Sequence, residues 1–175
     1  ALHAGVSATA DVVLIPEIPF DLGPVCDKIM DREARGRRFS IVVVAEGARP
    51  VDGGRVGRDQ GAGREVKLGG IAVQVARGIT ERTGKETRTV VLGHLQRGGG
   101  PTTFDRLLSL RFGAAAVRMV ADRTFGVMVA LDPPTVLAVP IEVATERMKC
   151  VPLDSDTMLT ARDLGISFGD EVEEG

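Results

Sequence analysis

Short apolar runs alternate along this chain with longer segments in which apolar residues recur at helical spacing. The short run at residues 11–15 and the continuous run at 39–45 are typical of buried strands, and residues 87–92 are expected to form a third strand. Between them, one apolar stripe extends from Leu22 to Met30 and a second from Leu68 to Ile79. Each expected strand is thus followed by a helix. This order predicts an α/β fold with a Rossmann-like, doubly wound and mostly parallel sheet.

Local signals mark the ends of the expected helices. Asp21 can cap the first helix, and Gly84 stands where the second should end. Thr102 and Asp105 form a capping box that opens a third, long helix, whose apolar side extends from Phe104 to Val120. The Gly-rich, charged segment 47–66 between the second strand and the second helix predicts a surface loop. Beyond the third helix we expect two strands, a helix and an irregular acidic tail, at residues 127–131, 136–139, 141–148 and 148–175.

The composition argues against several classes of partner. The 22 basic and 24 acidic residues give a net charge of −2, and the chain has neither Trp nor Tyr. Nucleic acid and anionic membranes are therefore not expected partners. The two cysteines lack metal-site or redox-motif spacing, and Cys26 falls on the apolar stripe of the first helix. No apolar run approaches the roughly 20 residues of a membrane span, so we expect a cytoplasmic protein.

The most informative candidate site follows the third expected strand. His94, Gln96 and Arg97 are followed directly by three glycines, Gly98–Gly100. Glycines let backbone N–H groups approach an anion closely, and a guanidinium can meet a phosphate through two parallel hydrogen bonds. The segment therefore suits a phosphorylated small molecule. The alternative is a mobile turn whose His and Arg face water.

Three further charged residues lie at the ends of expected strands. Glu46 could accept hydrogen bonds from sugar hydroxyls or could cap a neighbouring helix, whereas Glu17 is interpreted as organising a turn. Arg88 begins the third strand and Arg97 follows its end, so at about 3.3 Å per residue they lie on the order of 13 Å apart. Arg88 therefore either serves a site on a neighbouring subunit or is a solvated charge. No G-x-G-x-x-G follows a strand, and no metal-ligand cluster is evident.

The segment Val91–Arg106 closely resembles the L-G-H-x-Q-R-G-G-x-P-x-x-x-D-R hallmark of bacterial 6-phosphofructokinases. The resemblance extends along most of the chain, through residues 16–17, 42–47, 82–88 and 111–114. The loop at 47–66 and the run at 128–131 resemble actinobacterial-type members.

This resemblance implies a kinase that converts fructose 6-phosphate to fructose 1,6-bisphosphate in glycolysis, with ATP or pyrophosphate and Mg²⁺. It implies that His94 and Arg97 hold the sugar phosphate and that Glu46 binds a sugar hydroxyl. It also implies that Arg88 reaches the site of an adjacent subunit in a homodimer or homotetramer. In regulated members, residues that align with three positions here line an effector site; these are Asp11, Arg35 and Arg37.

The chain also departs from the family pattern. The family's donor loop, the segment with its catalytic Asp and its Met-Gly-Arg segment are absent and would precede Ala1, where no initiator Met stands. The resemblance therefore covers the C-terminal half, and we expect this chain alone to be inactive. Residues 1–97 would form the substrate-binding domain, residues 98–147 would pack on the donor domain, and residues 148–175 would form a tail. A non-catalytic sugar-phosphate sensor or regulatory half-domain is the alternative.

Overall fold

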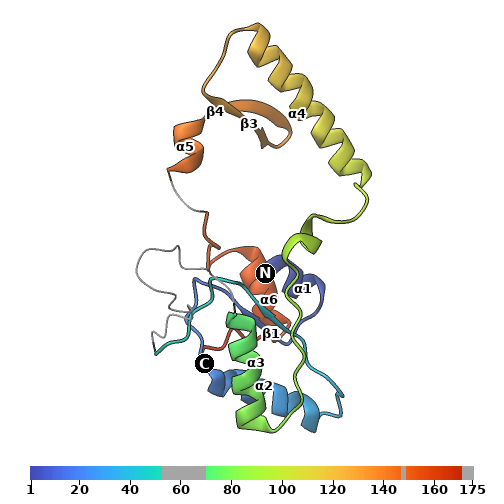
Figure 1. The fold of residues 1–175 in the computed structure, drawn as a ribbon, viewed down its shortest axis with the longest axis vertical. Coiled ribbons are helices and arrows are strands. Elements are labelled where there is room, and N and C mark those ends of the chain that lie inside the picture. Colours follow the sequence, from blue (N-terminus) through green and yellow to red (C-terminus); the bar gives the residue numbers. More distant parts are fainter. Residues whose placement is uncertain (53–69, 147–148, 171–175) are drawn as a thin grey trace. The chain divides into compact units, whose positions relative to one another are not determined.

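The computed structural model describes residues 1–52, 70–146 and 149–170 (Figure 1). The chain divides into two compact units. The first combines Ala1–Val91 with the segment that begins at Val151, and the second is Leu92–Cys150. The polypeptide therefore leaves the first unit once and returns to it once.

A short parallel sheet lies at the centre of the first unit. Strand β1 (Val12–Leu14) pairs in parallel with β2 (Val42–Val44), with Val12 opposite Val42 and Leu14 opposite Val44. On the other side of β1, Ser167 forms a parallel bridge with Val12. The carbonyl of Ser167 accepts the N–H of Val13 at 2.9 Å. Two of the three strands predicted for this sheet are thus confirmed, each shorter than the run that predicted it.

Helices cover both faces of this sheet, because successive residues of β1 point to opposite faces. Val12 and Leu14 pack with α2 (Leu22–Ala34) and α3 (Ile71–Thr83) in one core, which also contains Cys26 as predicted. Val13 packs in a second core with residues of α1 (Leu2–Ser7) and α6 (Asp156–Asp163). All three residues of β1 are fully buried. The α/β fold with helices on both faces of a parallel sheet is therefore confirmed.

The predicted ends of the first two long helices are also confirmed. The Asp21 carboxylate accepts the Gly23 N–H at 2.6 Å and caps α2. Helix α3 ends at Gly84, whose φ of +68° lies in the left-handed region that favours glycine. Leu68 and most of the predicted loop at 47–66 lie outside the described residues.

The C-terminal segment is held on the first unit by buried side chains of α6 and by an ion pair. Helix α6 precedes it, and Met158 and Ala161 of this helix are buried. The Arg162 guanidinium pairs with both carboxylate oxygens of Asp170 and lies 4.5 Å above the ring of buried Phe168. The prediction of an irregular tail is therefore wrong for residues 156–163, because a short helix there buries two apolar side chains one turn apart.

The second unit consists of a long helix and a hairpin. The short 3₁₀ helix η1 (Gly93–Arg97) precedes α4 (Thr103–Ala121), which opens with the predicted capping box of Thr102 and Asp105. Strands β3 (Val127–Asp132) and β4 (Thr135–Pro140) pair antiparallel, and α5 (Ile141–Thr145) follows. Residues 147–148 of the predicted last helix lie outside the described residues.

Two expectations about apolar segments need correction. Residues 87–92 form no strand, and Val90 and Val91 are 72% and 73% exposed. A strand requires a neighbour that supplies ladder hydrogen bonds, and no described strand pairs with this segment. Along α4, Ala115 is buried but Phe104 and Val120 are exposed, so the hairpin covers only part of the predicted apolar side.

Candidate functional site

The carboxyl ends of β1 and β2 bring two acidic residues to one edge of the parallel sheet. Glu17 follows β1, and Glu46 follows β2. The turns that carry them are adjacent, because a Cβ on Gly47 would lie 3.1 Å from Cγ of Pro16. Ligands of open α/β sheets bind at this edge. Glu46 is exposed, and its carboxylate contacts no polar partner within the part of the chain that the structure describes.

Glu17 does more than organise a local turn. Its Oε1 accepts the N–H of Val151 at 2.8 Å, although the two residues are 134 positions apart. Val151 is the residue at which the chain returns to the first unit. The other carboxylate oxygen, Oε2, is buried without a partner among the described residues. No local sequence signal could have indicated this contact, since it joins distant parts of the chain.

His94 and Arg97 are brought together by η1. They are three residues apart, and side chains at this spacing eclipse in a 3₁₀ helix, which has about three residues per turn. The imidazole and the guanidinium therefore project from the same side of the helix. Both side chains are exposed, and neither makes a hydrogen bond or ion pair with another described residue.

Two glycines around this short helix adopt a backbone geometry that favours glycine. Gly93 and Gly99 adopt φ values of +46° and +93°, in the region that residues with a Cβ rarely enter. Gly98 and Gly100 flank the second of these turns. The segment thus presents one cationic fork, one imidazole and an open glycine backbone, which suits a tetrahedral oxyanion.

Arg88 lies in the first unit, in the segment between α3 and η1 that forms neither helix nor strand. Its guanidinium pairs with Glu86 at 3.1 Å, and both side chains are highly exposed. Because no strand forms here, the predicted position of Arg88 at a strand start is wrong. The four predicted substrate residues therefore fall into two groups, with Glu46 and Arg88 in the first unit and His94 and Arg97 in the second.

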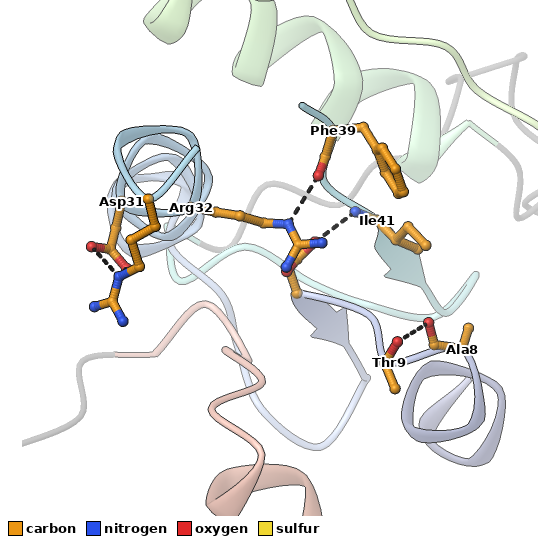
Figure 2. Close-up of polar contacts among 8 residues, drawn as sticks. Ala8, Thr9, Asp31, Arg32, Phe39 and Ile41 are labelled. Carbon is orange, nitrogen blue, oxygen red and sulfur yellow. Dashed lines mark hydrogen bonds and ion pairs between the residues drawn. The ribbon is translucent and has the colours of Figure 1, made fainter. Parts of the chain in front are cut away.

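Asp11 of the predicted effector set is buried in a network of its own. Its carboxylate accepts the N–H of Ile41 at 2.8 Å and pairs with Arg32 of α2 at 2.7 Å. Arg32 also donates to the carbonyl of Phe39 at 2.9 Å (Figure 2). Asp11 is only 4% exposed, so this network uses both of its oxygens inside the protein. Arg32, which pairs with Asp11, was not among the predicted effector residues, whereas Arg35 was.

The two predicted effector arginines lie close together at the end of α2. Arg35 pairs with Asp31 of the same helix at 3.0 Å, and both side chains are largely exposed (Figure 2). Arg37 follows Gly36, whose φ is +80°, and is also exposed. Arg35 and Arg37 are thus exposed, whereas Asp11 is buried, and neither arginine is a partner of Asp11.

The resemblance implies Mg²⁺, but the described residues form no cluster of ligands to which it could be assigned. None of their His, Cys, Asp or Glu side chains gather in a group of three or more that could hold a metal ion. Magnesium is therefore assigned to no residue in the described ranges. Among the same residues, no helix combines the length and the apolar character required to cross a membrane.

The fold and the glycine-flanked His–Arg segment define an α/β protein with an exposed cationic loop, and comparison with known proteins identifies its family. The sequence profile of the family described as Phosphofructokinase matches residues 1–120. The chain belongs to the phosphofructokinase family. This confirms the resemblance on which the sequence analysis relied.

The relatives show how much of a family member the chain represents. It is 50% identical over 172 residues to an ATP-dependent 6-phosphofructokinase of Chloroflexus aurantiacus, covering 98% of this chain and 47% of the relative. It is 46% identical over 171 residues to a pyrophosphate–fructose 6-phosphate 1-phosphotransferase of Streptomyces coelicolor, covering 97% of this chain and 48% of the relative. The chain therefore spans about half the length of the curated relatives it matches.

Solved structures agree with the assignment of the fold. The crystal structure of Pichia pastoris phosphofructokinase in the T-state superposes with a TM-score of 0.61 at 32% sequence identity. That match covers 93% of this chain and 17% of the yeast chain. The pyrophosphate-dependent phosphofructokinase of Nitrosospira multiformis, at 22% identity and a TM-score of 0.64, shares the fold.

Proposed function

We propose that this chain forms the fructose 6-phosphate-binding part of a 6-phosphofructokinase, which uses ATP or pyrophosphate with Mg²⁺ to make fructose 1,6-bisphosphate. The observation that carries the proposal is the pairing of His94 and Arg97 on one side of η1, beside the open backbone of Gly98–Gly100. The names of the relatives support fructose 6-phosphate as the substrate. One relative is ATP-dependent and another uses pyrophosphate, so both phosphoryl donors are included in the proposal.

Each proposed contact uses a group that is available at the protein surface. Arg97 donates two parallel N–H groups to the 6-phosphate, and His94 adds a third donor from the same side. Glu46, at the carboxyl edge of the sheet, accepts a hydrogen bond from a sugar hydroxyl. The two exposed side chains of the η1 pair have no competing partners among the described residues, so no intramolecular contact is lost on binding.

Arg88 is proposed to bind the 6-phosphate in the site of a second copy within a homo-oligomer. Its only ion pair within the described residues is the exposed one with Glu86. Exposed pairs of this kind contribute little free energy, typically about 0–1 kcal/mol, so Arg88 can exchange Glu86 for a phosphate readily.

The catalytic contribution of these residues is to position the sugar. Phosphoryl transfer depends mainly on alignment of donor and acceptor and on stabilisation of charge. Contacts to the 6-phosphate and to one hydroxyl would hold the sugar in a fixed orientation. The 1-hydroxyl, which accepts the phosphoryl group, is then positioned for transfer at the expense of binding energy. The donor and the metal are assigned to no residue here.

Other parts of the proposal concern domain roles and regulation. Residues 1–97 would act as the substrate domain, and residues 98–147 would pack on a donor domain. The exposed apolar side chains of α4, including Phe104 and Val120, support the second role. Arg35 and Arg37 remain candidates for binding an anionic effector, while the internal partners of Asp11 argue against a direct role for it. A cytoplasmic location stays a prediction.

A turnover assay tests the proposal. The 175-residue chain and the full-length protein would each be given fructose 6-phosphate, Mg²⁺ and either ATP or pyrophosphate. We expect turnover by the full-length protein and none by the chain alone. Robust turnover by the chain alone would show that essential groups lie within it. A full-length protein that binds fructose 6-phosphate without turnover would instead support a sensor.

A further inference from the structure

A groove in the second unit contains two arginines that the proposed substrate site does not use. It lies between α4 and the β3–β4 hairpin and has a volume of about 340 Å³. Its lining consists of Arg111, Ala114, Arg118, Thr135 and Val136. None of these residues belongs to the predicted substrate or effector sets, and no acidic side chain lines the groove.

The two arginines differ in how they are held. Arg111 donates from its guanidinium to the carbonyl oxygen of Pro134 in the hairpin turn, which fixes that side chain at one end of the groove. Arg118 is exposed and makes no side-chain hydrogen bond or ion pair with any other residue in the described ranges. One cation is thus positioned by the fold, and the other has all its donors available.

The spacing of the arginines defines the shape of a ligand. Positions seven residues apart on a helix lie on the same face, about 10 Å apart along its axis. Ala114, between them on this face, has a short side chain that leaves the groove open. Thr135 adds a hydroxyl, and Val136 adds an apolar surface. Two separated cations with an apolar wall between them match a molecule with an anionic group at each end.

We propose that this groove binds a small organic bisphosphate or a molecule of the same chemistry, with one anionic group on Arg111 and the other on Arg118. The planar guanidinium forks bind phosphate oxygens in pairs, and the lining offers no carboxylate that would repel them. The site is separate from η1, which carries His94 and Arg97.

Calorimetric titration of the full-length protein with butane-1,4-diphosphonate tests the proposal, because this probe has two anionic ends and no sugar. We expect it to bind more tightly than butylphosphonate, which has one anionic end. Arg118→Gln should weaken diphosphonate binding about tenfold, which is the usual effect of losing a charged hydrogen bond. The variant should then bind the diphosphonate no more tightly than it binds butylphosphonate.

Arg123→Asn is the matched control. It removes one exposed cation just beyond α4, and Asn tolerates the positive φ of +55° found there. This variant should bind the diphosphonate as the wild type does. Circular dichroism and thermal unfolding would verify that both variants are folded. Equal weakening by the two substitutions, or no diphosphonate binding by the wild type, would overturn the proposal.

Arg97→Gln separates this proposal from the proposed function. It should weaken binding of fructose 6-phosphate and leave diphosphonate binding unchanged, whereas Arg118→Gln should do the reverse. Loss of diphosphonate binding in Arg97→Gln but not in Arg118→Gln would assign the probe to η1 and overturn the groove proposal.

Discussion

Asp11 joins three segments of the first unit through its carboxylate. It connects the start of β1 to the N–H of Ile41 and to Arg32, which in turn holds the carbonyl of Phe39 (Figure 2). A buried carboxylate is stable only when it is paired and hydrogen-bonded, and both conditions are met. The network therefore fixes the chain at Ile41, just before β2 and five residues before Glu46.

Removal of this carboxylate should cost far more stability than removal of its surface neighbour. Asp11→Ala leaves Arg32 and the Ile41 N–H without their partner, and we expect a loss of about 3 kcal/mol in the free energy of unfolding. Asp31→Ala, which breaks only the exposed pair with Arg35, should cost less than about 1 kcal/mol. Denaturant titration would measure both. Equal losses for the two variants would contradict the structural role of Asp11.

Asp105 should titrate below the usual range of an aspartate. A hydrogen bond from the Thr102 hydroxyl, followed by one from the Thr102 N–H, lowers the pKa of this carboxyl. Because the folded pKa is lowered, the capping contribution is complete above the unfolded pKa and is lost as the pH falls through the folded pKa.

Thr102→Val would test this cap directly. It removes the hydroxyl, so the pKa of Asp105 should rise part of the way toward its usual value, while Thr103→Val at the next position should leave it unchanged. Carboxyl-carbon NMR titration measures both. An Asp105 pKa that is the same in Thr102→Val and in the wild type would show that the hydroxyl does not cause the shift.

Among the secondary-structure elements, the long helices were the most predictable from sequence. Their apolar spacing and their caps at Asp21, Gly84 and Thr102 are local signals, and each was confirmed. The run at 87–92 has the composition of a strand but forms none, because strand formation depends on a partner elsewhere in the chain. Helix α6 was missed because the acidic residues around it obscure an apolar pair, Met158 and Ala161.

Two helical glycines should respond to alanine in opposite directions. A Cβ on Gly5 of α1 would lie 2.2 Å from a methyl carbon of the fully buried Val13, so Gly5→Ala should destabilise the protein by about 1–3 kcal/mol. A Cβ on Gly113 of α4 would meet nothing within 4 Å, so Gly113→Ala should stabilise by about 1 kcal/mol through helix propensity. Thermal unfolding of both variants checks the prediction; stabilisation by Gly5→Ala would contradict the close packing of α1 on β1.

At the scale of the whole molecule, the four candidate residues belong to two compact units of the chain. The sequence identified Glu46, Arg88, His94 and Arg97 because the family resemblance covers the segments that contain them. It could not anticipate that the first two lie in one unit and the last two in another. That division depends on where the chain leaves and re-enters the first unit, and the return is marked by the contact of Glu17 with Val151.

The most direct test of the proposed function is the KM for fructose 6-phosphate of the full-length Arg97→Ala variant. Loss of the charged phosphate contact should raise KM about 10- to 100-fold. Arg77→Ala, which removes an exposed cation of α3 that pairs with Glu81, should leave KM unchanged. An Arg97→Ala enzyme with the wild-type KM would contradict the assignment of this segment to the sugar phosphate.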